Sequence, residues 1–193
     1  MEKANLAHFI NQHLPVHIQV LDEIISKFEE RVISKHLFFL SEGEFSKEYL
    51  FLESGFMRAF TLDVNGNEVT TNFYSGNNVV FEVSSFFTHT RSKESIQALT
   101  DCKGYAITFE QSNTLFHSLP QFREFGRAML VKGFVGLKER TLSLINQTAE
   151  QRYAHLIQSK PEIFQHTPLK YIASYLGITD TSLSRIRKDF SRK

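Results

Sequence analysis

The chain has 193 residues, of which 41% are hydrophobic, and a formal net charge of +1, so it can hold one domain or two small ones around a packed core. Its single cysteine, Cys102, excludes an internal disulfide and an iron–sulfur cluster held by this chain's cysteines alone. Residues 1–8 lack the pattern of a signal peptide, and no apolar run approaches the ~20 residues of a membrane span. We therefore expect a cytoplasmic protein with no membrane partner.

The first two thirds of the chain change from a helical to a strand pattern. Apolar residues recur with a period near 3.6 over residues 5–28, interrupted at Pro15, which predicts helix. From about residue 31, short apolar or β-prone runs alternate with turn signals, and Asn65-Gly66 is a strong hairpin signal. The predicted strand runs are residues 32–40, 49–52, 56–62, 69–74, 96–99 and 104–108. This pattern predicts an antiparallel β-sandwich or barrel of the jelly-roll kind.

Helical periodicity returns at Phe109 and includes one long stretch. Residues 121–145 contain no proline and predict a helix of roughly 35–40 Å at 1.5 Å per residue. Such a helix is too long to be covered by one small domain. We therefore expect part of its apolar face, between Met129 and Leu144, to meet a second copy of the chain. A further helix is predicted over residues 148–158.

Residues 168–188 have the pattern of a helix-turn-helix. The signals are an apolar face on the first helix, a glycine where a tight turn needs positive φ, an N-cap, and an inward apolar pair on the second helix: Ile172, Ala173, Leu176, Gly177, Thr179, Leu183 and Ile186. The second helix of such a motif fits the DNA major groove. Two ordinary packed helices are the alternative interpretation.

The distribution of charge favours a nucleic-acid partner for this segment. Residues 167–193 carry six basic and two acidic side chains, whereas residues 1–166 carry sixteen basic and nineteen acidic ones. A basic segment beside a helix of groove size is the electrostatic pattern of a phosphate-binding surface. A solvated C-terminal charge cluster would explain the charge but not the turn residues.

The order helix, β-barrel, long helix, helix-turn-helix resembles the Crp/Fnr superfamily of bacterial transcription regulators. The motifs that carry the resemblance are residues 40–44, 49–58, 65–66, 95–99, 148–153, 170–179 and 182–187. The last two are most similar to the branch found in Bacteroidetes-type bacteria. The resemblance implies an α+β fold with a cyclic nucleotide-binding-like domain with N-terminal helices over 1–120, a long dimerisation helix over 121–147 and a DNA-binding domain over 148–193. Because the sequence stops at Lys193, we expect the family's β-hairpin wing to be truncated.

The resemblance also implies a homodimer that binds double-stranded DNA and contacts RNA polymerase. Arg185 matches the family's base-reading arginine, while Asp180-Thr181 replaces an Arg-Glu pair, so we expect an altered sequence preference in which Thr181 contacts a thymine methyl group. Ser184 lies on the outer face of the same helix. The expected phosphate contacts are Lys170, Thr179, Ser182, Arg187 and Lys188.

A cyclic-nucleotide pocket in the barrel needs a carboxylate for the ribose and an arginine with helix amides for the phosphate. The candidate effector-binding residues are Glu82, Arg91, Ser92 and Thr141. The sequence departs from the family here, since Phe81-Glu82 replaces a Gly-Glu and Leu137-Lys138 replaces a hydroxyl pair. We therefore expect a barrel not tuned to cyclic AMP, with no cofactor and an unknown small-molecule effector. Surface ion pairing is the other interpretation of Glu82 and Arg91.

Two competing functions follow from these patterns. A sensing module for a cyclic nucleotide or another small ligand, with weak or vestigial DNA binding, is the main alternative. An enzyme is not expected, because no nucleophile–base pair or paired-carboxylate motif is visible. No metal site is expected either, since Pro15 separates His13 from His17 and breaks the helix face they would share.

Overall fold

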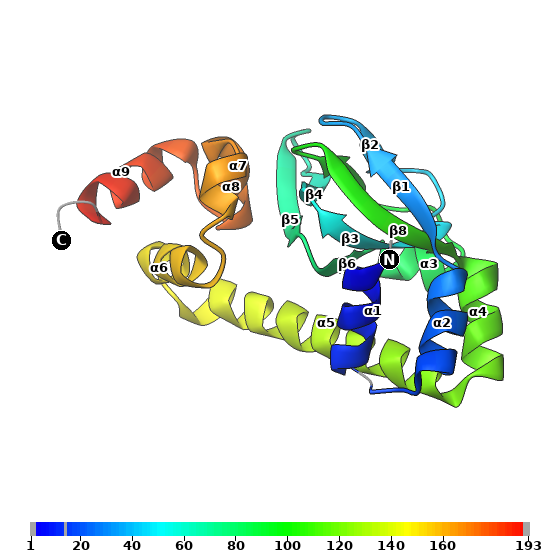
Figure 1. Cartoon of the computed structure of the whole chain (residues 1–193). Helices are drawn as coiled ribbons and strands as arrows, with labels where there is room; N and C mark the ends of the chain where they lie inside the picture. The colour runs from blue at the N-terminus through cyan, green and yellow to red at the C-terminus, as the bar shows by residue number, and fades with distance from the viewer. Residues whose placement is uncertain (1–2, 14, 191–193) are drawn as a thin grey trace.

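The computed structural model describes residues 3–13 and 15–190 and is shown in Figure 1. A β-barrel carries helices α1, α2 and α4 at one end, and the long helix α5 leads away from that end to the C-terminal helices α6–α9 (Figure 1). The end of α9 lies far from the N-terminal helices (Figure 1).

The N-terminal stretch forms two helices rather than one. Helix α1 (Ala4–His13) and helix α2 (Ile18–Ser26) lie on either side of Pro15, as the interruption in the periodicity predicted. Their apolar faces pack with α4 (Phe109–Ser118) and the start of α5 against the barrel. The buried residues of this cluster are Leu6, Phe9, Ile10, Leu21, Ile24, Phe28, Phe51, Tyr105, Ile107, Leu115, Phe122 and Phe125.

The barrel consists of two four-stranded antiparallel sheets in the described residues, which confirms the jelly-roll prediction. One sheet has the order β1 (Glu29–Ile33), β8 (Cys102–Thr108), β3 (Glu48–Ser54) and β6 (Asn78–Val80). The other has the order β2 (Phe38–Leu40), β7 (Ser95–Ala98), β4 (Phe56–Leu62) and β5 (Glu68–Ser75). A short helix, α3 (Val83–Thr88), connects β6 to β7.

Two strand predictions have different outcomes. The single run predicted over residues 32–40 is wrong, because the chain turns at His36 (φ 72°) and places β1 and β2 in different sheets. The Asn65-Gly66 hairpin is confirmed: β4 and β5 pair as far as Leu62 and Glu68, and Gly66 has a φ of 82°. The Asp63 carboxylate stabilises this turn by accepting the backbone N–H groups of Asn65 and Asn67.

Helix α5 (Pro120–Asn146) confirms the long helix predicted over residues 121–145. Its first turns are buried through Phe122 and Phe125, and Met129 packs against the same core. Gly126 lets the Phe116 ring of α4 approach, since a Cβ there would overlap that ring. Residues 130–139 are all exposed in the single chain.

The C-terminal part contains α6 (Ala149–Ser159), α7 (Ile163–His166), α8 (Leu169–Tyr175) and α9 (Asp180–Phe190). Helices α8 and α9 confirm the predicted helix pair, with Gly177 between them at a φ of 68°. Leu183 and Ile186 of α9 are buried against Ile172, Ala173 and Leu176 of α8. The expected truncation of a wing concerns positions after Phe190, outside the described residues.

Candidate functional site

The outward face of α9 carries the predicted DNA-contacting residues. Seven of the eight predicted residues in the turn and helix from Thr179 to Lys188 are exposed and Ser182 is half-buried, while Lys170 is exposed on α8. The exposed seven are Thr179, Asp180, Thr181, Ser184, Arg185, Arg187 and Lys188. Because Leu183 and Ile186 hold the opposite face in the core, the helix presents a polar and cationic surface to solvent.

Thr179 has a structural task at the start of α9. Its Oγ1 accepts a hydrogen bond from the Ser182 backbone N–H at 3.3 Å, which confirms the predicted N-cap. The same oxygen lies 2.9 Å from Thr181 Oγ1 and 3.0 Å from Ser182 Oγ. These three hydroxyls therefore form a cluster at the end of the helix that would face a phosphate backbone.

Arg185 lies within electrostatic reach of helix α6. The pKa of Glu150, in the first turn of α6, is lowered by its own backbone N–H and by the Thr148 hydroxyl, and the charges of Arg185 and Arg152 lower it further. The predicted base-reading arginine therefore has an acidic neighbour within the same domain.

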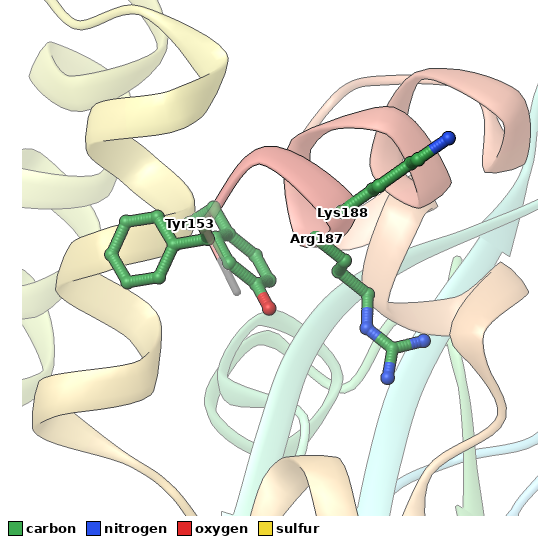
Figure 2. Close-up of a pocket in the computed structure, with 4 residues that line it drawn as sticks. Tyr153, Arg187 and Lys188 are labelled. Atoms are coloured by element: carbon green, nitrogen blue, oxygen red, sulfur yellow. The ribbon is translucent and has the colours of Figure 1, made fainter. Parts of the chain in front are cut away.

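A shallow basic hollow of about 410 Å³ lies between α6 and the end of α9. Tyr153, Arg187, Lys188 and Phe190 line it, and Figure 2 shows the Arg187 and Lys188 side chains diverging from α9. The Tyr153 ring packs edge-on against Phe190 at 5.4 Å between centroids and against Phe164 at 5.6 Å. This aromatic packing holds the end of α9, from which Arg187 and Lys188 project, against α6.

Arg152 connects the segment after α5 to the end of α8 through hydrogen bonds. Its Nε and Nη2 donate to the carbonyl oxygen of Leu176, at 3.1 and 2.8 Å, and its Nη1 donates to Gln147 at 2.6 Å. Cations stabilise the carbonyl end of a helix, so Arg152 holds the end of α8. This role has no local signal in the sequence, although Arg152 lies inside the 148–153 motif.

In the barrel, the candidate effector residue Glu82 caps a helix. Its two carboxylate oxygens accept the backbone N–H groups of Ser84 at 3.0 Å and Ser85 at 2.6 Å. Ser84 and Ser85 lie in the first turn of α3, the short helix that precedes Arg91. The amides that would face an anion in a cyclic-nucleotide pocket are therefore already bonded to a carboxylate of the chain itself.

Arg91 and Ser92 fasten their loop to the turn before β3. The Arg91 Nη1 donates to the Gly43 carbonyl at 2.6 Å, and its guanidinium lies 5.2 Å from the Phe45 ring centre. The backbone of Ser92 donates to Glu44 and accepts from Gly43. Arg91 also lines an open hollow of about 410 Å³ beside residues 39–40 and 44–48. Surface ion pairing is thus wrong as an account of Glu82 and Arg91, whose partners are backbone groups.

Each of the four candidate effector residues already has a hydrogen-bond partner within the chain. Thr141 is exposed on α5 and its hydroxyl donates to the Leu137 carbonyl. The charged group that approaches the barrel from α5 is Arg140, which counteracts the burial that raises the pKa of Glu94. No cluster of three or more His, Cys, Asp or Glu side chains suited to a metal ion occurs in the described part of the chain.

Cys102 and the phenylalanines near Glu82 take part in side-chain packing. Cys102 is buried, and burial raises the pKa of its thiol. Phe86 is buried in a cluster of edge-on rings with Phe81 and Phe109. Phe87 packs edge-on against Phe81 and Phe86 and is 42% exposed.

Comparisons with known proteins agree with this architecture. Residues 30–118 match the cyclic nucleotide-binding domain family. The fumarate and nitrate reduction regulatory protein of Salmonella typhi is 25% identical over 95% of this chain and 75% of its own length. FixK2 from Bradyrhizobium japonicum has the same fold, with a TM-score of 0.74, 16% identity and coverage of 86% of this chain and 85% of its own.

A regulator of the Crp/Fnr family from Eubacterium rectale is similar along 93% of this chain and 88% of its own, with a TM-score of 0.73 and 14% identity. The relatives from Salmonella typhi and Eubacterium rectale are regulatory proteins. Within residues 3–13 and 15–190, no helix has the length and apolar composition needed to cross a membrane. The matched domain, the relatives similar along most of the chain and the common architecture together support a regulator of the Crp/Fnr family.

Proposed function

We propose that this protein is a homodimeric transcription regulator that reads a pseudo-palindromic DNA site through the major groove. The observation that carries the proposal is the exposed polar and cationic face of α9, opposite the buried Leu183 and Ile186. An α-helix with one face fixed in a small domain and the other open to solvent is the shape that a major groove accepts. Its similarity to the Bacteroidetes-type branch stays a prediction.

Arg185 is the base reader in this proposal. A guanidinium that binds guanine N7 and O6 in two hydrogen bonds discriminates by about 1–3 kcal/mol. Thr181 offers a methyl group to a thymine, and Asp180 at the same end disfavours a nearby phosphate. The remaining contacts, from Lys170, Thr179, Ser182, Arg187 and Lys188, fix the position of the protein on the DNA backbone.

The dimer would form along α5. Its outer half exposes large apolar side chains on a helix that the rest of the chain does not cover: Leu130, Val131, Phe134, Val135, Leu137, Leu142, Leu144 and Ile145. Gly133 and Gly136 add open space beside them, which permits close approach of a second helix. Two copies would then place two α9 helices on one face of the DNA, as an inverted repeat requires.

The barrel in this proposal does not respond to cyclic AMP. Glu82 accepts two amides of the first turn of α3, and Arg91 is bonded to Gly43. A cyclic phosphate would have to break these contacts before it gained its own. A small-molecule effector of other chemistry and RNA polymerase complete the proposed set of partners.

Selection of bound sequences from a random DNA pool tests the proposal. We expect enrichment of two inverted half-sites with one preferred spacing, bound more weakly as salt rises because phosphate contacts release counterions. The variant Phe134→Asp should dissociate the dimer in sedimentation experiments and lose the preference for paired half-sites, whereas Lys132→Asp, on an exposed position of the same helix, should keep both. Failure of the wild-type protein to enrich any sequence would reject DNA reading as its function.

A further inference from the structure

Strand β5 lies at the edge of its sheet, and some of its backbone groups form hydrogen bonds with helices outside the barrel. In the order β2–β7–β4–β5, the strand has a neighbour on one side only, and unpaired edge groups must find other partners. The Thr70 N–H donates to Ser174 Oγ of α8 at 3.2 Å, and the Thr70 carbonyl accepts from Arg140 Nη2 of α5 at 3.4 Å. One residue of the barrel edge is thus bonded to both the helix-turn-helix and the long helix.

Helix α8 meets this edge with one face. Tyr171, Ser174 and Tyr175 are spaced so that they share a side of the helix, and Ser174 Oγ also lies 3.1 Å from Thr70 Oγ1. An arginine stacks on each tyrosine: the guanidinium carbon of Arg58 is 3.4 Å from the centre of the Tyr171 ring, and that of Arg140 is 3.8 Å from the centre of the Tyr175 ring. These contacts fix α8 along its length, whereas a single contact would let it pivot.

Arg58 shows that this contact has a specific geometry. The arginine is 1% exposed, lies between the rings of Phe60 and Tyr171, and binds Glu68 and Gln97 through Nη2. Its Nε and Nη1 have no hydrogen-bond partner among the described residues. Burying a charge is costly, and the Tyr171 ring belongs to α8, so the barrel keeps this guanidinium out of water only while α8 is docked.

Arg140 connects three parts of the molecule. It belongs to α5, donates to Thr70 of β5 and stacks on Tyr175 of α8. Its positive charge also acts on Glu94, the carboxylate just before β7, near Glu82. The Tyr175 ring in turn packs against Phe73 of β5, with 5.0 Å between centroids. A movement of α5 or β5 would therefore alter the contacts that hold α8, the helix that supports the recognition helix α9.

We propose that Arg58, Arg140 and the Thr70–Ser174 pair form a seat on the barrel edge that sets the angle of the α8–α9 pair relative to α5. Arg58 and Arg140 are positioning residues in this arrangement and need not touch DNA. The inference rests on the proposed function, because a fixed angle in each half of a dimer determines which half-site spacing both recognition helices can reach together.

The spacing preference tests the seat. Wild type, Arg140→Gln and Tyr175→Leu are compared by mobility shift on inverted half-sites at a series of spacings and on a single half-site. Each variant removes a cation–aromatic contact that holds α8 on the barrel edge, so we expect affinity for the best spacing to fall about tenfold and the spacing profile to flatten. Single half-site affinity should not change. Tyr175→Phe, which keeps the ring, and Lys132→Gln, an exposed cation on α5, should behave as wild type.

A second measurement does not depend on DNA. Spin labels at Val64→Cys, on the exposed hairpin tip, and Ser184→Cys, on α9, report the distance between barrel and recognition helix when labelled chains are diluted with unlabelled ones. We expect a narrow distribution in the wild-type background and a broad one with Arg140→Gln or Tyr175→Leu. Equal widths in all three would overturn the seat, even if the protein binds DNA. If the wild-type protein binds no DNA but the two variants still broaden the distribution, the proposed function is rejected and the seat is retained.

Discussion

The barrel loop around Glu82 and Arg91 and the outward face of α9 both match functional motifs, but their side chains are engaged differently. In the barrel, Glu82 bonds two amides of its own helix and Arg91 bonds the Gly43 carbonyl. On α9, Ser184, Arg185 and Arg187 extend from a helix whose other face is buried. The first region is internally bonded, and the second is directed at solvent.

This difference decides which motif can act on a partner. A polar group that already has a hydrogen bond gains little from exchanging it for another, because the net worth of such a bond is only about 1 kcal/mol. An exposed cation gives up only water, counterions and weak surface attractions, such as that of Arg185 to Glu150, when it meets a phosphate or a base. The same residue types therefore stabilise the fold in the barrel and remain available for recognition on α9.

The largest expected effect is on the recognition side. Arg185→Ala should weaken binding to the selected DNA site about 5- to 150-fold, as loss of a paired contact to guanine implies, and should leave the free energy of unfolding unchanged. The measurement is a mobility shift on selected and random DNA. Arg187→Ala is the matched variant: it should weaken binding to both DNAs and reduce the salt slope by about one. Equal losses on both DNAs for Arg185→Ala would contradict its role as base reader.

The next effect is on the stability of the barrel. Glu82→Ala removes the cap of α3 and should lower the free energy of unfolding by about 1 kcal/mol, measured by denaturant titration. Glu82→Asp, with a carboxylate that also caps helices, should recover part of the loss. Glu23→Ala, an exposed carboxylate on α2, should have little effect. Unchanged stability in Glu82→Ala would show that the carboxylate is not committed to the helix.

The helix-turn-helix could be predicted because its signals are local. Gly177 supplies positive φ, Thr179 supplies an N-cap, and Leu183 with Ile186 gives the inward face. Each depends on residues within a few positions along the chain. Helix α5 was predictable for the same reason, since its periodicity and lack of proline extend over its whole length.

The seat on the barrel edge and the role of Glu82 could not be predicted in this way. Thr70 bonds to Ser174, 104 residues away, and Arg140 bonds to Thr70 across 70 residues. Nothing in the local pattern of a strand shows that its edge will be covered by a distant helix. The prediction over residues 32–40 was wrong for a different reason. The turn at His36 uses a residue with no strong turn preference, so the sequence does not mark the break between the two strands.

A smaller effect, on the pH dependence of the free energy of unfolding, is expected at Glu94. Burial raises the pKa of this carboxyl and repulsion from Glu82 adds to the rise, while a hydrogen bond with Thr71 and the charge of Arg140 oppose it. The protonated form is therefore favoured in the folded state, so its stabilisation is complete below the unfolded pKa of about 4.3 and is lost as the pH rises through the folded value. Glu94→Gln should match wild type in unfolding free energy at low pH and exceed it at pH about 7. Glu23→Gln is the control, and a difference that grows toward low pH would contradict this sign.

The smallest expected effect is at Arg91. Arg91→Ala removes one hydrogen bond from an exposed side chain to Gly43, while the backbone bonds that join Ser92 to Gly43 and Glu44 remain, so unfolding should become easier by only about 0.5 kcal/mol. A ligand at 100 times its Kd would stabilise the fold by about 2.7 kcal/mol, which a thermal shift detects easily. Cyclic AMP should produce no such shift in either protein. A shift in wild type that disappears in Arg91→Ala would mean that Arg91 exchanges the Gly43 carbonyl for a phosphate, and the barrel loop would then join α9 as a binding surface.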